Sequence, residues 1–260
     1  MSRVDLPDTY LEAEVSGKGE PIVLCPGLAG LGSFWSKQVP ALSARYQVIT
    51  YDHRGCGGSD PELGEVSVET MAADLLGLLD ALGIERATLV GHSTGGAIGQ
   101  YLAAHHPDRI ARLVLSCTWP ASDAYFSGLF NLRKRVIELM GLSDYGLLGS
   151  YFIYPPRYLA EYPEILAPKT VDRAEQVARS YRRRIDAILK FDSRPYLEKI
   201  RVPTLVIGAA DDILTPPYFS EELAKRISGA ELALLPCGGH YCPVTATDDY
   251  NARLKRFLEE

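Results

Sequence analysis

One pentapeptide constrains the fold of this chain more than any other feature. Residues 91–95 read Gly-His-Ser-Thr-Gly and directly follow the apolar run at residues 87–90. The G-x-S-x-G pattern is typical of a sharp turn from a buried strand into a helix, where the serine backbone is strained and small residues must flank it. We therefore predict that the Ser93 hydroxyl stands free near helix N-terminal amides that stabilise an oxyanion. A glycine-rich loop with an incidental serine is the alternative interpretation.

The composition narrows the class of protein. The 260 residues, 47% of them hydrophobic and 23% charged, fit one large globular α/β domain. The net charge of −6 argues against nucleic acid and anionic membrane surfaces as partners. No apolar run approaches the roughly 20 residues of a membrane span, and no apolar signal core follows the first five residues. We expect a cytoplasmic protein, with homodimer formation left open.

Cysteine usage agrees with that compartment. The count is odd, and we expect free thiols at Cys25, Cys56, Cys117, Cys237 and Cys242. Two of them flank His240 in a C-x-x-H-x-C spacing, but no second ligand pair accompanies it. The sequence therefore predicts no metal site.

Strand and helix patterns alternate along most of the chain. Strands are predicted over 10–15, 21–25, 46–51, 86–90, 112–117, 203–208 and 230–236, and helices over 67–82, 94–106, 217–227 and 245–259. Residues 120–195 break this alternation with a helical, aromatic-rich pattern. We interpret 1–119 and 196–260 as an α/β core and 120–195 as a helical lid (cap) above the strand ends, the alternative being a separate helical domain.

A serine nucleophile needs a base, and the base needs an orienting carboxylate. His240 follows a glycine pair after the predicted strand 230–236, which puts it at the same sheet edge as Ser93. We therefore predict His240 as the base. We expect the His92 side chain to point to the opposite side of the elbow. The remaining histidines are expected in a turn and at a helix end: His53, His105 and His106.

Two candidate acids follow the predicted strand 203–208, namely Asp211 and Asp212. Residues 52–59 read D-H-R-G-C-G-G-S. With the elbow and the order Ser, Asp, His, this segment resembles the α/β-hydrolase fold superfamily, in its serine-nucleophile branch. The resemblance implies that Asp52 and Arg54 are structural and that Asp212, which fits a D-x-x-[VTS]-P pattern, is the acid.

The resemblance also implies a fold and an oxyanion hole. The fold is a mostly parallel central sheet flanked by helices, with a helical lid inserted after the sixth strand. The two backbone donors are the amides of Thr94 and Leu28, although Pro26 stands where relatives often have histidine. No cofactor and no metal is implied.

Within the superfamily, the chain is most similar to the aminoacrylate/carbamate hydrolases of pyrimidine utilisation and the 3-oxoadipate enol-lactone hydrolases. The runs 151–156, 184–188 and 238–245 carry this likeness. It implies a serine hydrolase of the carboxylesterase, lactonase or amidohydrolase type that cleaves an ester, lactone or amide/carbamate bond of a small molecule through an acyl-enzyme.

The lid should select the substrate. Candidate pocket residues are Trp119, Phe126, Phe130, Tyr151, Phe152, Tyr154 and Arg184, any of which can instead be core or surface residues. Two other classes stay open because fold does not fix function. One is another activity of the same triad, namely C–C bond hydrolysis, hydroxynitrile lysis or perhydrolysis. The other is a non-enzymatic ligand receptor on a hydrolase scaffold.

Overall fold

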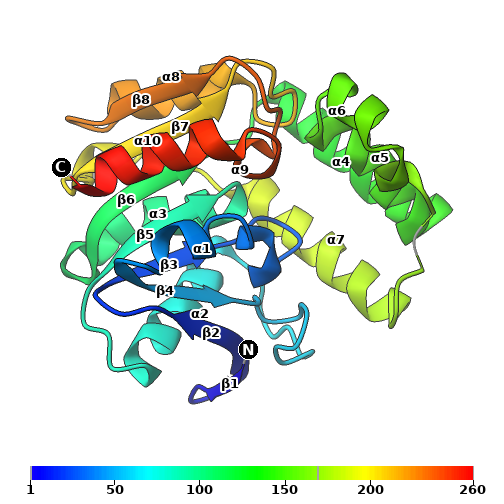
Figure 1. Ribbon diagram of the computed structural model, residues 1–260. Coiled ribbons are helices and arrows are strands. Elements are labelled where there is room, and N and C mark those ends of the chain that lie inside the picture. The colour runs from blue at the N-terminus through cyan, green and yellow to red at the C-terminus, as the bar shows by residue number, and fades with distance from the viewer. Residues whose placement is uncertain (1, 169, 260) are drawn as a thin grey trace.

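One mixed sheet of eight strands organises the molecule in the computed structural model, which describes residues 2–168 and 170–259 (Figure 1). The strand order is β1-β2-β4-β3-β5-β6-β7-β8. The strands are β1 (Ser2–Asp5), β2 (Tyr10–Ser16), β3 (Glu20–Cys25), β4 (Tyr46–Tyr51), β5 (Ala87–His92), β6 (Ile110–Ser116), β7 (Thr204–Ala209) and β8 (Glu231–Leu235).

The direction of the strands fixes where a site can form. Strands β3 to β8 pair in parallel, whereas β2 runs antiparallel to β1 and β4. The order reverses between β3 and β5, which are hydrogen-bonded neighbours. In open α/β sheets, ligands bind beyond the carboxyl ends of the strands at such a switch point. The loops that follow β3 and β5 therefore meet where a ligand is expected.

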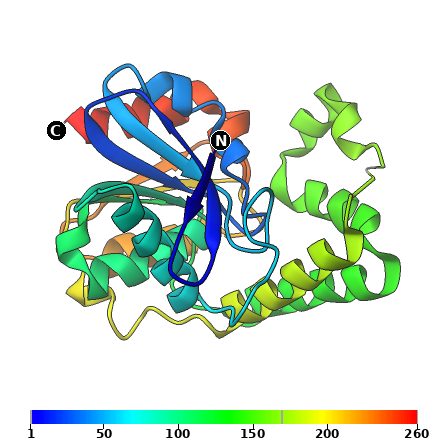
Figure 2. The same ribbon diagram turned by 90° about the horizontal axis from the view of Figure 1, so that it is seen from below.

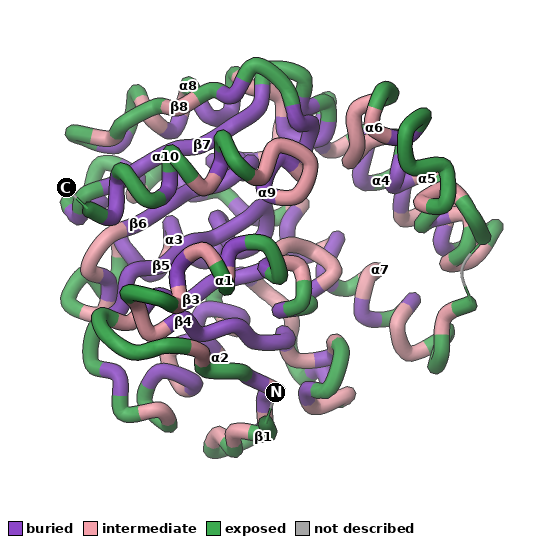
Figure 3. Tube along the Cα trace, viewed as in Figure 1, coloured by how far each residue is buried: buried purple, intermediate pink, exposed green. Residues whose placement is uncertain are grey.

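Alternation along the buried strands supplies a core on each face of the sheet. In β3, Val23 packs into the core on one face, whereas Ile22 and Leu24 pack into the core on the other. The first core includes residues of α2 (Val68–Ala81), α3 (Thr94–His105) and α8 (Pro217–Arg226). The second includes residues of α1 (Val39–Leu42), α9 (Cys242–Thr245) and α10 (Thr247–Glu259). The sheet is consequently buried along most of its length (Figure 3).

Among the described residues, four α-helices lie between β6 and β7, inside the segment predicted as a lid. They are α4 (Ala124–Met140), α5 (Leu142–Ile153), α6 (Pro156–Glu161) and α7 (Ala174–Lys190). Figure 2 shows them, green to yellow, as a group beside the α/β core. The two ends of this insertion meet, because Ala121 and Asp192 form an isolated bridge and the Ser193 amide donates to the Pro120 carbonyl at 2.8 Å.

The predicted strands and helices of the core are all present, with ends shifted by a few residues. The α/β-hydrolase fold, including a helical insertion after the sixth strand, is confirmed. The edge strand β1 was not predicted, because its four residues are mostly exposed and carry a single apolar side chain. In the part of the chain that the structure describes, no helix combines the length and apolarity needed to cross a membrane.

Candidate active site

Ser93 stands at a strained turn between β5 and α3. Its backbone has φ 54° and ψ −115°, a conformation that a residue other than glycine rarely adopts. The flanking glycines are required by close packing. A Cβ on Gly91 would lie 2.2 Å from the Gly95 carbonyl oxygen, and a Cβ on Gly95 would lie 2.2 Å from the Cys25 oxygen of β3. The pentapeptide thus forms the predicted elbow.

Asp212 and His240 meet in loops that follow β7 and β8. The Nδ1 of His240 lies 3.0 Å from Asp212 Oδ2, and both side chains are buried. Asp212 Oδ1 also accepts from the amides of Leu214 and Thr215 at 2.8 and 2.9 Å, and Oδ2 accepts from the Thr215 hydroxyl at 2.7 Å. These four contacts fix the carboxylate against the imidazole and leave the opposite ring nitrogen, Nε2, as the atom available to a substrate-side partner.

Asp211 has a separate role in the same loop. Its carboxylate accepts from the amides of Gly238 and Gly239 at 3.2 and 2.8 Å. It therefore orders the backbone that leads into His240. Of the two aspartates, Asp212 contacts the imidazole, whereas Asp211 caps the loop.

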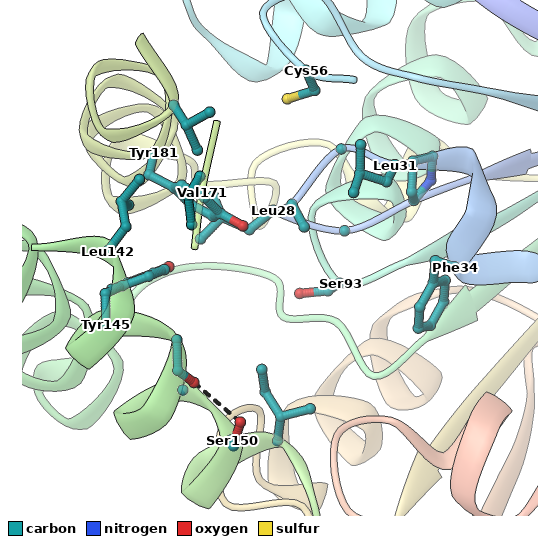
Figure 4. Close-up of a pocket in the computed structure, with 18 of the residues that line it drawn as sticks. Leu28, Leu31, Phe34, Cys56, Ser93, Leu142, Tyr145, Ser150, Val171 and Tyr181 are labelled. Atoms are coloured by element: carbon teal, nitrogen blue, oxygen red, sulfur yellow. Dashed lines mark hydrogen bonds between the residues drawn. The ribbon is translucent and has the colours of Figure 1, made fainter. Parts of the chain in front are cut away.

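Ser93 and His240 line one cavity of about 1050 Å³. Figure 4 shows the Ser93 hydroxyl directed into this cavity, with Leu28 and Leu31 on the core side and Tyr145 and Tyr181 on the side of α5 and α7. The nucleophile is 5% exposed. A bound molecule would therefore meet Ser93 at a nearly buried point of the cavity wall, where electrostatic interactions are stronger than in water.

The loop after β3 lies against the nucleophile. A Cβ on Gly27 would be 3.2 Å from Ser93 Cβ, so the Gly27–Leu28 peptide is next to the serine. Thr94 follows Ser93, opens α3 and is fully buried. The first amides of a helix have no partner within it. The two predicted oxyanion donors, Leu28 and Thr94, are thus on the two segments that meet at Ser93.

The position of His92 differs from the expectation. Its ring lines the cavity, stacks on Phe34 with ring centroids 4.6 Å apart, and lies 4.8 Å from the His240 ring centroid. Its Nδ1 is 3.2 Å from Ser116 Oγ. Burial, with a smaller effect of His240, lowers the pKa of His92 well below its usual value. His92 therefore forms part of the cavity wall beside His240. Its lowered pKa disfavours the protonated form that a general base must adopt, so it does not compete with His240.

The residues expected to be structural hold the loops around the site. Asp52 accepts from the amides of Gly32 and Gly58 at 2.8 and 3.0 Å, which ties the loop after β3 to the loop after β4. Arg54 forms ion pairs with Asp74 at 2.5 Å and with Asp8 at 3.1 Å. Both residues brace the loops without lining the cavity, as predicted.

Of the seven residues proposed for the pocket, two line the cavity and five do not. Phe130 and Tyr154 line the cavity. Trp119 and Phe126 instead stack on each other in the core, with centroids 4.7 Å apart, and Phe152 packs against that core. Tyr151 is 55% exposed and does not line the cavity. Arg184 is buried but does not line the cavity. Which side chains of these helices face the cavity depends on how each helix is rotated about its axis, and tertiary packing sets that rotation.

Arg133 lines the cavity, and the sequence interpretation missed it. It lies on the buried face of α4 with Phe130 and Ile137, which are at helical spacing from it. Its Nη2 donates to Tyr145 Oη at 2.9 Å, and its guanidinium lies 5.0 Å from the Phe130 ring centroid. No carboxylate of the described residues pairs with it, and its Nε has no partner. An arginine within an apolar helical stripe was the signal that could have found it.

Comparisons with known proteins agree with this geometry. A family model described as the alpha/beta hydrolase fold matches residues 20–136. A protein of Azorhizobium caulinodans named "Putative carbamate hydrolase RutD" is 38% identical over 258 residues, 97% of this chain and 96% of that protein. A protein of the same name from Caulobacter sp. is 38% identical over 242 residues, 92% of this chain and 90% of that protein.

A solved structure extends the likeness to the whole backbone. The enol-lactonase from Burkholderia xenovorans LB400 superposes with a TM-score of 0.90 at 28% identity, covering 100% of both chains. The match therefore includes the helices between β6 and β7 as well as the sheet. Because relatives that are 38% identical match nearly the whole chain, and because the enol-lactonase shares its backbone, this chain belongs to the α/β-hydrolase family and is a hydrolase.

Proposed function

We propose that this hydrolase cleaves an ester, lactone or amide/carbamate bond of a small molecule through an acyl-enzyme. Ser93 is the nucleophile, His240 the general base and acid, and Asp212 the orienting carboxylate. The observation that carries the proposal is the 3.0 Å contact between buried Asp212 and His240 Nδ1, beside a cavity that His240 and the strained Ser93 both line. This is the arrangement of roles that activates a serine hydroxyl.

The proposed reaction has two steps. His240 Nε2 takes the hydroxyl proton as Ser93 Oγ bonds to the carbonyl carbon, and the amides of Leu28 and Thr94 hold the oxyanion. His240 then passes the proton to the leaving oxygen or nitrogen, which departs and leaves the acyl-enzyme. Water, deprotonated by His240, then attacks the acyl carbon. The bond from that carbon to Ser93 Oγ breaks, His240 returns the proton to Ser93 Oγ, and the acid product leaves. Each oxyanion donor is worth about 3 kcal/mol in favourable cases.

The walls of the cavity support a small substrate that bears a negative group. The Arg133 guanidinium lines the cavity without a carboxylate partner among the described residues, so it can bind an anionic group of the substrate. The relatives named as a carbamate hydrolase and an enol-lactonase support a small carbonyl compound as the substrate. Action in the cytoplasm is part of the proposal and rests on the odd number of cysteines. The acidic net charge supports a protein that acts without nucleic-acid or membrane partners.

The test is hydrolysis of p-nitrophenyl esters from acetate to decanoate by wild type and Ser93→Ala. We expect turnover of the short esters and its loss in the variant by a factor of at least about 1000, because the remaining groups cannot form the acyl-enzyme. Ser122→Ala, at the start of the insertion, is the matched control and should retain wild-type rates. Equal rates in wild type and Ser93→Ala would refute the proposed nucleophile.

A further inference from the structure

Arg184 places a positive charge in the interior behind the loop that follows β3. It belongs to α7, is 1% exposed, and reaches three groups of two core loops. Its Nη2 donates to the Gly27 carbonyl oxygen at 3.4 Å and lies 2.5 Å from His53 Nδ1, and its Nη1 donates to Cys56 Sγ at 2.9 Å. A Cβ on Gly30 would lie 2.6 Å from Nη1, so glycine at this position gives the guanidinium its space.

This charge has no counter-ion among the described residues. The acid whose pKa responds to Arg184, Asp74, is already paired with Arg54 at 2.5 Å. Burial, together with the Arg184 charge, lowers the pKa of His53 well below its usual value, so His53 is neutral and its Nδ1 accepts. A buried unpaired charge costs free energy, and such violations of packing rules gather at functional sites.

The Gly27 carbonyl connects Arg184 to the proposed oxyanion hole. Gly27 C=O and Leu28 N–H belong to one planar peptide unit, so a donor that fixes the oxygen also fixes the direction of the amide. The oxygen accepts from Gly30 N at 2.9 Å as well as from Arg184. Hydrogen bonds at the oxygen polarise the peptide and strengthen its N–H as a donor.

We propose that Arg184 is a positioning residue of the oxyanion hole. It orients and polarises the Gly27–Leu28 peptide, and its positive charge favours the negative charge that develops on the other side of that peptide. The inference rests on the proposed serine mechanism. It does not make Arg184 a substrate clamp, because Arg184 is outside the cavity lining.

The test measures reactions that load the oxyanion hole. A small alkyl fluorophosphonate reacts with Ser93 Oγ: an O–P bond forms, the P–F bond breaks, fluoride leaves and His240 takes the proton. Phenylboronic acid bonds to the same oxygen and becomes a tetrahedral anion. The proteins are wild type, Ser93→Ala, Arg184→Met, Arg184→Lys and the control Arg182→Met, whose charge pairs with exposed Glu175 on the same helix.

We expect Arg184→Met to slow labelling of Ser93 by about tenfold to a hundredfold and to weaken phenylboronic acid binding by a similar factor. The KM for p-nitrophenyl acetate should stay within about twofold while kcat falls, since the peptide acts on the transition state. Arg184→Lys should fall between Arg184→Met and wild type, and Arg182→Met should match wild type. A general loosening of the cavity would instead raise KM.

The outcomes separate the two proposals. Labelling of Ser93 in Arg184→Met at the wild-type rate overturns the role of Arg184 and leaves the serine mechanism standing. If Arg184→Met does not fold, as seen by circular dichroism, Arg184→Lys decides, and wild-type rates in Arg184→Lys overturn the inference. If wild-type Ser93 is not labelled at all, the serine mechanism fails, and the role of Arg184 fails with it.

Discussion

Two buried arginines, Arg133 and Arg184, differ in the groups that surround their guanidinium charge. Arg184 donates to core loops behind the nucleophile, whereas the Arg133 guanidinium lines the cavity with one phenol, Tyr145 Oη, as its hydrogen-bond partner among the described residues. Burial raises the pKa of Tyr145, so this phenol stays protonated and does not neutralise Arg133. An anionic substrate group would complete the contacts of Arg133, because charge-assisted hydrogen bonds are strongest away from water.

Replacing Arg133 should therefore change specificity and not the chemical step. For an ester with a distal carboxylate, such as mono-p-nitrophenyl succinate, we expect Arg133→Met to raise KM by about tenfold to a hundredfold, the value of a hydrogen bond to a charged group. For neutral p-nitrophenyl acetate, kcat/KM should change less than about threefold. Arg135→Met, on the exposed face of α4, is the control. Equal losses on both esters would contradict an anion subsite.

Single residues were predictable where short windows of sequence carry the signal. Ser93 directly follows an apolar strand, and Asp212 and His240 each follow one after a short loop; parallel strands bring these positions to one sheet edge. Arg133 was not found because its role depends on which face of α4 is buried. The pairing of Arg184 with Gly27 joins residues 157 positions apart, which no local pattern reports.

Among the elements, α3 is distinguished by how closely it approaches the sheet. A Cβ on Gly99 would lie 2.8 Å from Leu113 Cδ1 and 2.9 Å from Leu89 Cδ2, on neighbouring strands β6 and β5. At the start of the helix, Gly95 faces the backbone of Cys25, which cannot move aside as a side chain can. The position of α3, and of Ser93 before it, thus depends on glycine, which has no side chain, at positions 95 and 99.

Gly95→Ala should separate α3 from β3. We expect a loss of about 1–3 kcal/mol in the free energy of unfolding, as in other overpacked sites, and a fall in kcat/KM because the elbow shifts. Gly128→Ala, at an exposed position of α4, is the matched control: outside the neighbouring backbone of its own helix, no atom lies within 4 Å of the added Cβ. It should stabilise by about 0.5–1 kcal/mol without affecting catalysis. Urea unfolding and ester kinetics measure both, and a stable, active Gly95→Ala would contradict the packing argument.

At the scale of the whole molecule, two buried neutral histidines couple stability to pH. His53 and His92 are both buried, and burial lowers the pKa of each well below its usual value. The unfolded chain binds protons at these groups near their ordinary pKa of about 6.5, whereas the folded chain does not. Their contribution to stability is therefore complete above that pH and is lost as the pH falls below it.

This coupling predicts that the free energy of unfolding falls with decreasing pH, and that replacing one of the two histidines makes this slope less steep. Between pH 6 and pH 5, each histidine should lower the free energy of unfolding by up to about 1.4 kcal/mol per pH unit. His53→Gln should remove one such share, while Gln Oε1 can still accept from Arg184. His105→Gln, which changes an exposed histidine, should leave the slope as in wild type. Urea titrations at pH 8, 6 and 5 give the slopes, and an unchanged slope in His53→Gln would refute the argument.

The sheet of the whole molecule was also largely predictable. Buried parallel strands are continuous apolar runs between turn residues, so β3 to β8 were recognisable, with ends set by hydrogen bonding that the pattern does not show. The arrangement of α4–α7 was not, because these helices pack mainly on one another and on loops distant in sequence. Their helical character followed from residue spacing, but their orientation did not.

The joined ends of the insertion have an evolutionary consequence. Because Ala121 and Asp192 are bridged, the chain leaves the sheet after β6 and returns toward β7 at nearly the same point. Apart from Arg184, which reaches back to the core loops, the segment between these residues can be lengthened, shortened or exchanged by recombination without altering the register of a strand. Descendants of one such gene can thus diversify the substrates they accept while Ser93, Asp212 and His240 stay on the core.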